Sequence, residues 1–154
     1  MTTTDEINNE IKLMGYVPFI PKSENPNYYR LDDGSILRVY PILNNLTLNP
    51  AQGDSVQVNV QNIIATFVPK KLRGTPSTKS YTQQELQANI EVFDMGFTTI
   101  IEDFNAYDVD SKQIMSIKTT VSQISKCKLF NNIGEPIYLV ATPFVVKSKP
   151  RGIT

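Results

Sequence analysis

The pattern of apolar and polar positions along the chain occurs twice. A segment with apolar residues three or four apart leads to a glycine and an aromatic residue, and short segments with alternating apolar residues follow. The same order returns about 78 to 81 residues later. The matching motifs are Thr3-x-x-Glu6-Ile7 with Thr82-x-x-Glu85-Leu86, Gly15-Tyr16 with Gly96-Phe97, Asn27-x-Tyr29 with Asn105-x-Tyr107, Asp32 with Asp110, and Arg73-Gly74 with Arg151-Gly152. We therefore predict a tandem duplication, with one repeat unit at 1–77 and the second at 78–154.

Each unit is predicted to begin with a short helix. Thr3 and Thr82 each stand three residues before a glutamate, which is capping-box spacing. We expect the first helix from Asp5 to Met14. In the second unit the residues expected to line one helical face are Leu86, Ile90 and Phe93. Gly15 and Gly96 are expected to end the helices in left-handed conformations, and the first strands are expected at Tyr16–Ile20 and Phe97–Ile101.

The segments after each helix read as antiparallel strands. Asp32-Asp33-Gly34-Ser35 between apolar runs predicts a hairpin, and the second unit lacks this glycine, so its turn should differ. In the long strand that follows, the apolar residues change parity between Leu43 and Leu46 and again between Val121 and Ile124. The partner strands change parity too, after Val60 in one unit and after Ala141 in the other. A parity change that keeps burial requires an extra residue, so we predict irregular strand pairing at these points.

These elements predict a β-dominated α+β fold. Each unit would contain a helix and about four antiparallel strands, and the two units would pack as a pseudo-two-fold barrel or sandwich. A unit of about 77 residues buries only roughly 60% of its unfolded surface, so a shared core is expected. Two independent small domains are the alternative, joined by 70–78, a basic segment with proline and glycine that is expected to be loosely held.

Composition argues against an enzyme. The chain has no histidine, so catalytic triads and zinc sites that use histidine are excluded, and its single cysteine cannot form an internal disulfide. Cys127 lies between two lysines, which favours a reactive thiolate, but a solvated strand position without a base is the better interpretation. No glycine-rich phosphate loop is present. We expect no catalytic residue, no metal and no cofactor.

Acidic residues occur in pairs that invite a metal or hydrolase interpretation. The pairs are Asp32-Asp33, Glu102-Asp103 and Asp108-x-Asp110. Lys112 occupies the next ligand position of a calcium loop, so that motif fails. Asp32-Asp33-Gly34 is typical of a turn that bonds its own backbone. A hydrolase that works through carboxylates is the least favoured function.

A nucleic-acid interface is the alternative function. Lys and Arg equal Asp and Glu at 15 each, so no global attraction to phosphate is expected. A local basic stripe would form if the units pack two-fold, and Tyr28, Tyr29 and Tyr107 would then be available to stack on bases. The residues of this candidate stripe are Lys70, Lys71, Arg73, Lys149 and Arg151.

The favoured prediction is a non-enzymatic binding or assembly module. A duplicated chain does in one molecule what a homodimer of its unit would do, and its edge strands offer surfaces for self-association or for a protein partner. No apolar run is long enough to span a membrane, no secretory signal is evident, and no small-molecule ligand is indicated. A cytoplasmic location is expected.

Overall fold

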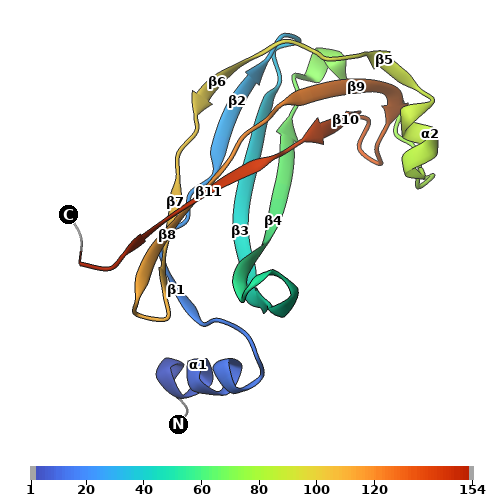
Figure 1. Ribbon diagram of the computed structural model, residues 1–154. Coiled ribbons are helices and arrows are strands. Elements are labelled where there is room, and N and C mark those ends of the chain that lie inside the picture. The colour runs from blue at the N-terminus through green and yellow to red at the C-terminus, as the bar shows by residue number, and fades with distance from the viewer. Residues whose placement is uncertain (1–2, 153–154) are drawn as a thin grey trace.

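The computed structural model describes residues 3–152 and is dominated by antiparallel β-sheet, as predicted (Figure 1). The helices are α1 (Thr4–Leu13) and α2 (Gln83–Gln87), and the 3-10 turns are η1 (Pro50–Gln52) and η2 (Lys70–Leu72). The strands are β1 (Phe19–Ser23), β2 (Asn27–Leu31), β3 (Ile36–Asn49), β4 (Ser55–Phe67), β5 (Ile90–Val92), β6 (Phe97–Ile101), β7 (Asn105–Val109), β8 (Gln113–Thr119), β9 (Gln123–Phe130), β10 (Pro136–Ala141) and β11 (Phe144–Pro150).

Two of the three sheets take one strand from across the join at 70–78. The strand orders are β4-β3-β2-β6, β1-β7-β8-β11 and β10-β9-β5. β1 pairs with β7, so that Phe19 lies opposite Val109, and β6 pairs with β2, so that Phe97 lies opposite Leu31. Each of these two strands therefore completes a sheet whose other strands come from the far side of the join.

The hydrophobic core consists of two clusters arranged along the long β3–β4 hairpin. Upper β3 packs with β9 and β10, through residues that include Leu37, Val39 and Ile124. Lower β3 packs with β7 and β8, through residues that include Leu46 and Ile117. Both clusters contain residues from 1–77 and from 78–154, so neither segment supplies a complete cluster alone.

The first helix is confirmed and the second is shorter than predicted. The Thr3 hydroxyl accepts from the Glu6 N–H at 3.2 Å, and Gly15 has a φ of 94°. The predicted capping box begins α2, but the helix ends at Gln87. The predicted face Leu86–Ile90–Phe93 is wrong, because Ile90 enters β5 opposite Cys127, where the edge of β9 offers backbone partners. Phe93 is 68% exposed as a result.

Gly96 does not adopt the predicted left-handed conformation. The positive φ in this turn belongs to Asp94, at 54°. Gly96 is instead a point of close approach: its carbonyl accepts from the Asp32 N–H at 3.0 Å, and a Cβ would lie 2.3 Å from the Asp32 carboxylate. β6 begins at Phe97 as predicted, whereas β1 begins at Phe19, three residues later than predicted. Tyr16 forms only an isolated bridge with Thr47.

The hairpin turns differ as predicted. The β2–β3 turn places Gly34 at a φ of 90° and bonds Ser35 N–H to the Asp33 side chain at 2.9 Å. The β7–β8 turn lacks glycine and instead holds Asp110 and Ser111 at φ values of 48° and 56°. Two successive left-handed residues form the mirror-image turn that suits tight hairpins.

The parity changes in the long strands are also confirmed. The β3–β4 pairing shifts register between Leu43 and Asn45. At the other predicted parity change, between Val121 and Ile124, the strand breaks, because β8 ends at Thr119 and β9 starts at Gln123. The chain passes there from one sheet to another, so a bulge in β3 corresponds to a complete break between β8 and β9.

The partner strands follow the prediction only in part. β4 carries no shift of its own, because β3 contains the extra residue. Asn62 therefore stays on the inner face, and Ile63 lies on the outer face with 45% exposure. β10 and β11 do break apart, after Ala141. A further shift between Pro136 and Tyr138 turns Tyr138, rather than the predicted Ile137, toward the core.

The join is packed, not loose. The Gly74 N–H donates to the Gly134 carbonyl at 2.8 Å, and the Ser77 N–H donates to the Asn131 carbonyl at 3.0 Å. A Cβ on Gly74 would lie 2.4 Å from the Phe130 ring. The join therefore lies directly on the β9–β10 turn, with no room for a side chain at residue 74. Residues 147–152, which the repeat pattern matches with the join, are different: 147–150 belong to β11, and Arg151 and Gly152 follow it in a turn.

Gly74→Ala should destabilise the fold by about 1–3 kcal/mol, because the packed Phe130 ring must move to admit a methyl group. Gly15→Ala is the comparison: no atom lies within 4 Å of its Cβ position, so only the left-handed φ costs stability, about 1 kcal/mol. Denaturant unfolding of the two variants measures the difference. Equal stability of Gly74→Ala and the wild type would contradict the close packing of the join.

Candidate interaction surface

The molecule has a large surface for its mass. Its solvent-accessible area is 9495 Å² for 17.3 kDa. A compact monomer of this mass exposes about 7,800 Å², so about 1,700 Å² is in excess. Among the described residues seventeen large hydrophobic side chains are exposed, against fourteen hydrophobic residues in the buried core. Exposed apolar surface on this scale is typical of proteins that bind other proteins.

Much of this surface lies on the edge strands β4 and β11. β4 is thirteen residues long and pairs only with β3, and β11 pairs only with β8. Every residue of β11 is exposed. The apolar side chains that the two strands present are Ile63, Ile64 and Phe67 on β4 and Phe144, Val145 and Val146 on β11. Long apolar edges with free backbone groups favour the addition of another strand.

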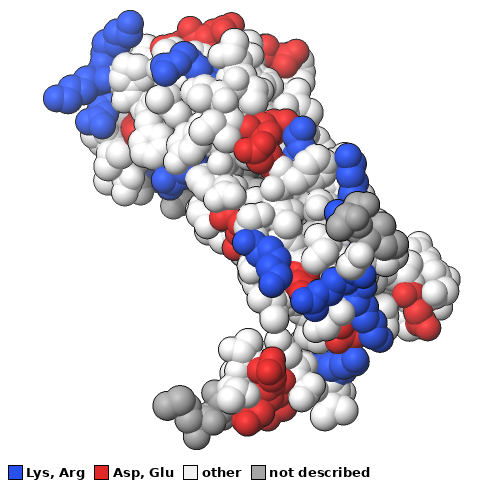
Figure 2. All heavy atoms as spheres, turned by 90° about the vertical axis from the view of Figure 1, so that its left-hand side faces the viewer, with Lys and Arg blue, Asp and Glu red and all other residues white. Residues whose placement is uncertain are grey.

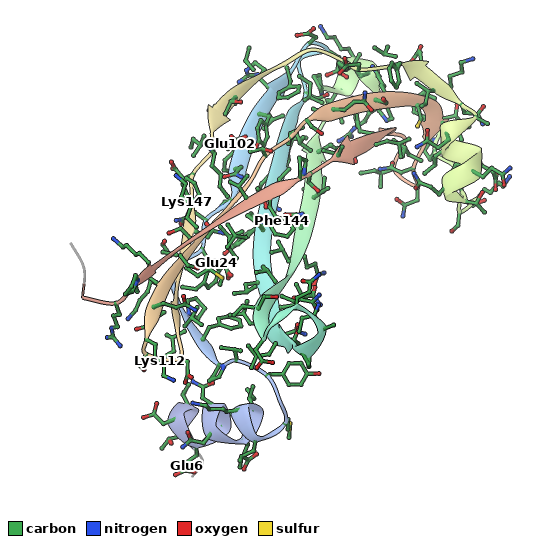
Figure 3. All side chains as sticks on the ribbon, in the orientation of Figure 1. Glu6, Glu24, Glu102, Lys112, Phe144 and Lys147 are labelled. Atoms are coloured by element: carbon green, nitrogen blue, oxygen red, sulfur yellow. The ribbon has the colours of Figure 1, made fainter. Side chains whose placement is uncertain are left out.

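The two edges meet at one point. The Asn62 amide on β4 donates to the Thr142 hydroxyl, just before β11, at 3.2 Å. Beside this contact Phe144 lies between β11 and the β3–β4 hairpin (Figure 3). An open groove of about 620 Å³ runs there, with Val58 and Val60 on its β4 side. The exposed apolar residues of β4 and β11 thus extend in opposite directions from a shared groove.

Between the sheets, the carboxylates of Glu24 and Glu102 hold buried tyrosines (Figure 3). The Tyr29 hydroxyl donates to Glu102 at 2.6 Å, and the Tyr107 hydroxyl donates to Glu24 at 2.6 Å. Burial, and then these bonds to carboxylates, raise the pKa of both tyrosines well above the ordinary value of 10.0. The phenols therefore stay protonated near neutral pH and act as structural donors.

Other contacts also occur in matched pairs, in which each residue of one contact lies 78 positions from its equivalent in the other contact. The Asn27 amide donates to the Thr119 carbonyl at 3.0 Å, and the Asn105 amide donates to the Pro41 carbonyl at 3.2 Å. Three further pairs of contacts are related by the same 78 positions. They are Val17 N–H to Leu46 O with Met95 N–H to Ile124 O, Asp110 N–H to Pro18 O with Asp32 N–H to Gly96 O, and the ring contact of Phe19 with Tyr107 together with that of Phe97 with Tyr29.

A polar cluster beneath the β2–β3 turn is the most enzyme-like feature. The Tyr138 hydroxyl donates to Asp33 at 2.5 Å and lies 3.2 Å from the Ser35 hydroxyl. The Lys126 ammonium lies 3.2 Å from the same carboxylate, and both side chains are largely buried. Burial alone would raise the pKa of Asp33, but the hydrogen bonds from Tyr138, Ser35 and Lys126 outweigh it and lower that pKa.

The same contacts determine the protonation of Tyr138 and the hydrogen bonding of Asp33 in this cluster. Burial and the bond to Asp33 raise the pKa of Tyr138 far above 10.0, so its phenolate is not accessible near neutral pH. The carboxylate is already held by three donors. The cluster therefore fastens the β2–β3 turn to β9 and β10, and no group in it is free to accept a proton.

The other chemical candidates are also engaged in structure. Cys127 is buried, its thiol contacts the Leu86 carbonyl at 3.6 Å, and burial raises the pKa of the thiol. Asp110 pairs with Lys12 at 2.9 Å, and Asp108 pairs with Arg151 at 3.1 Å. Within residues 3–152 no three His, Cys, Asp or Glu side chains gather closely enough to hold a metal ion.

The residues of the candidate basic stripe lie in two places. Lys70, Lys71 and Arg73 lie on and after η2, beside the β2–β3 turn at the top of Figure 1. Lys149 and Arg151 lie at the end of β11, beside the β7–β8 turn lower in the molecule. The two groups do not form one stripe. Tyr29 and Tyr107 are 0% and 1% exposed and offer no face to a base, whereas Tyr28 is half-buried.

Comparison of the chain with protein-family models, curated proteins and solved structures finds no match. None of the helices in residues 3–152 is long and apolar enough to cross a membrane.

The groove and the two exposed edges were not identifiable from the sequence as a site. Ile63 and Phe67 follow the same alternation as core residues, and their exposure depends on the bulge residing in β3 rather than β4. The only local signal in β11 is the polar character of its second half, Lys147-Ser148-Lys149, which is unusual for a strand in a covered sheet.

Tyr138→Phe should lower the free energy of unfolding by about 1.5–3 kcal/mol, because Asp33 loses a donor in a buried setting. Tyr28→Phe is a matched control on a half-buried surface and should change it by less than about 0.5 kcal/mol.

The pH dependence follows from the lowered pKa of Asp33. The folded chain binds this proton more weakly than the unfolded chain, so Asp33 contributes stability above its ordinary pKa of 3.8. That contribution is lost as the pH falls below 3.8 through the pKa of the folded state. Asp33→Asn should therefore flatten this part of the stability curve, and an unchanged slope would contradict the role of the cluster.

Proposed function

We propose that this protein is a non-enzymatic assembly module that acts by self-association or by binding a protein partner. The observation that carries the proposal is the excess of accessible surface, about 1,700 Å² in total above that of a compact monomer, together with seventeen exposed large hydrophobic side chains among the described residues. A standard protein interface buries about 800 Å² on each partner, so the excess is large enough for stable association. Six of these side chains lie on β4 and β11, whose outer edges pair with no other strand in the described part of the chain, which suits pairing with another chain.

We also infer that the chain is an internal duplication packed about a pseudo-two-fold axis. The paired contacts support this inference: reciprocal placement of β1 and β6, two tyrosine–glutamate bonds and two asparagine–carbonyl bonds, each at a spacing of 78 residues. In this arrangement repeat units 1–77 and 78–154 share one core. The duplicated unit would resemble a dimer in which each member lends one strand, β1 or β6, to the other.

A binding role also agrees with the state of the polar groups. The buried phenols of Tyr29, Tyr107 and Tyr138 are held protonated by burial and by carboxylate partners. The carboxylates of Asp33, Asp108 and Asp110 have cationic partners. General acid–base catalysis needs a group whose pKa lies near the working pH, and burial moves the pKa of each of these three phenols further from neutral pH.

The alternative is a nucleic-acid interface at Lys70, Lys71 and Arg73. This alternative is supported by the exposure of all three residues on one short segment. Lys149 and Arg151 would form a second, separate contact. This alternative predicts affinity that falls by about 0.7–0.9 log units per tenfold salt for each phosphate contact.

The native mass in solution tests the proposal. Light scattering over about 1–100 µM should give a particle heavier than one chain of 17.3 kDa, with the population growing as concentration rises. Titration with single-stranded and duplex DNA and RNA at low salt should show no binding. A single-chain mass at every concentration would contradict self-association, and tight, salt-sensitive binding would establish the alternative instead.

A further inference from the structure

The outward face of α1 has no cover in the described part of the chain. This ten-residue helix has no buried residue, and Ile7 is 46% and Leu13 89% exposed. The Lys12–Asp110 ion pair ties it to the β7–β8 turn, at an exposed position where such a pair contributes little. A helix this short is marginal in water unless its apolar face is packed. α1 therefore has the character of a segment that becomes fully packed only against another molecule.

Unpaired charges of opposite sign lie at the two ends of the molecule. α1 carries Asp5, Glu6 and Glu10, and within residues 3–152 none of them forms an ion pair. Figure 2 shows acidic side chains on this lower element, and at the upper end it shows basic side chains that stand out beside acidic ones. Lys70 and Lys71 of η2 are exposed and likewise unpaired among the described residues.

The η2 end also presents apolar surface. Phe67, the last residue of β4, is 50% exposed and lies three residues before η2. The exposed Ile7 of α1, which lies close to Glu6 and Glu10, thus has a counterpart in Phe67, which lies close to Lys70 and Lys71. Contacts between like ends would place like charges together, whereas contact between unlike ends is attractive.

The excess surface agrees with two contacts per molecule. About 1,700 Å² is roughly twice the 800 Å² that one partner contributes to a standard interface. A molecule inside a head-to-tail series uses two different interfaces of this size, one at each end. A two-fold dimer through a single standard interface would leave half of the excess uncovered.

We propose that copies of this chain associate head to tail, with α1 of one copy docked on η2 and the end of β4 of the next. The inference rests on the proposed assembly function and names the partner as a second copy. Glu6 and Glu10 would face Lys70 and Lys71, and Ile7 would pack toward Phe67. Such a contact joins unlike surfaces, so repetition produces a ring where the rotation closes and a filament where it does not.

Charge reversal at each end tests the contact in the full-length chain. The first variant is Glu6→Lys with Glu10→Lys, and the second is Lys70→Glu with Lys71→Glu. Lys22→Glu with Lys128→Glu is the matched control, because it reverses two exposed lysines that lie outside α1, η2, β4 and β11. Light scattering at low ionic strength should show association at least about tenfold weaker for each end variant and unchanged association for the control.

An equimolar mixture of the two end variants separates loss of charge matching from loss of folding. In the mixture a reversed helix meets a reversed η2, so association should return to near the wild-type level. No recovery, or wild-type association by both end variants alone, overturns the head-to-tail contact while leaving assembly through another surface intact. Loss of association in the control alone also overturns the proposed contact, because it places the interface away from α1 and η2. A wild-type chain that stays monomeric at about 100 µM overturns both this inference and self-association itself.

Discussion

The arrangement depends on the exchange of two five-residue strands. β1 obtains its backbone partners from β7, and β6 obtains its partners from β2. Without this exchange each four-stranded sheet would lose an edge strand, and the aromatic contacts of Phe19 with Tyr107 and Phe97 with Tyr29 would be absent. The Asn27 and Asn105 amides lie at the crossing, nearly fully buried, and bond backbone carbonyls of the opposite segment. Buried amides of this kind penalise any other arrangement, because an unpaired one costs about 1–3 kcal/mol.

The exchange also explains how a chain with modest burial keeps a defined core. Each hydrophobic cluster combines residues from both sides of the join, so the clusters form only when the two segments are together. The surfaces outside the core are under no such constraint, and they differ between the two ends. At one end β5 covers the edge of β9 and a polar cluster fastens the β2–β3 turn. At the other end α1 stays helical and exposed, and an open pocket of about 440 Å³ remains between Leu48, Val56 and the β7–β8 turn.

Local features of the sequence predicted local structure well. The cap at Thr3, the turn at Gly34 and the irregular pairing after Leu43 each depend on a few neighbouring residues, and all three are present. The shortened α2 depends instead on a remote strand edge, because Ile90 leaves the helix to pair with β9. The left-handed conformation predicted for Gly96 was wrong for the same reason. This position requires glycine because the backbone closely approaches Asp32, which is 64 positions away in sequence.

The pairing of β1 with β7 and of β6 with β2 could not be predicted from the alternation of apolar residues. A five-residue strand has the same alternation whichever sheet it joins, so Phe19 or Phe97 gives no sign of its partner. The exposed surface was equally hidden, because Ile63, Phe67 and Val145 look like core residues until their sheet and face are known. Residues that carry a binding surface made of ordinary apolar side chains have no signature comparable to a metal or catalytic motif.

Native-state amide hydrogen exchange tests most directly whether β1 and β6 make residues 1–77 and 78–154 unfold as one cooperative unit. If they do, the paired amides of β1 and β6 exchange through the same opening, with the same free energy, as those of β2 and β7. Mild denaturant should then lower the protection of all four strands together. Two separate opening free energies, one for residues 1–77 and one for 78–154, or early independent release of β1, would contradict the account.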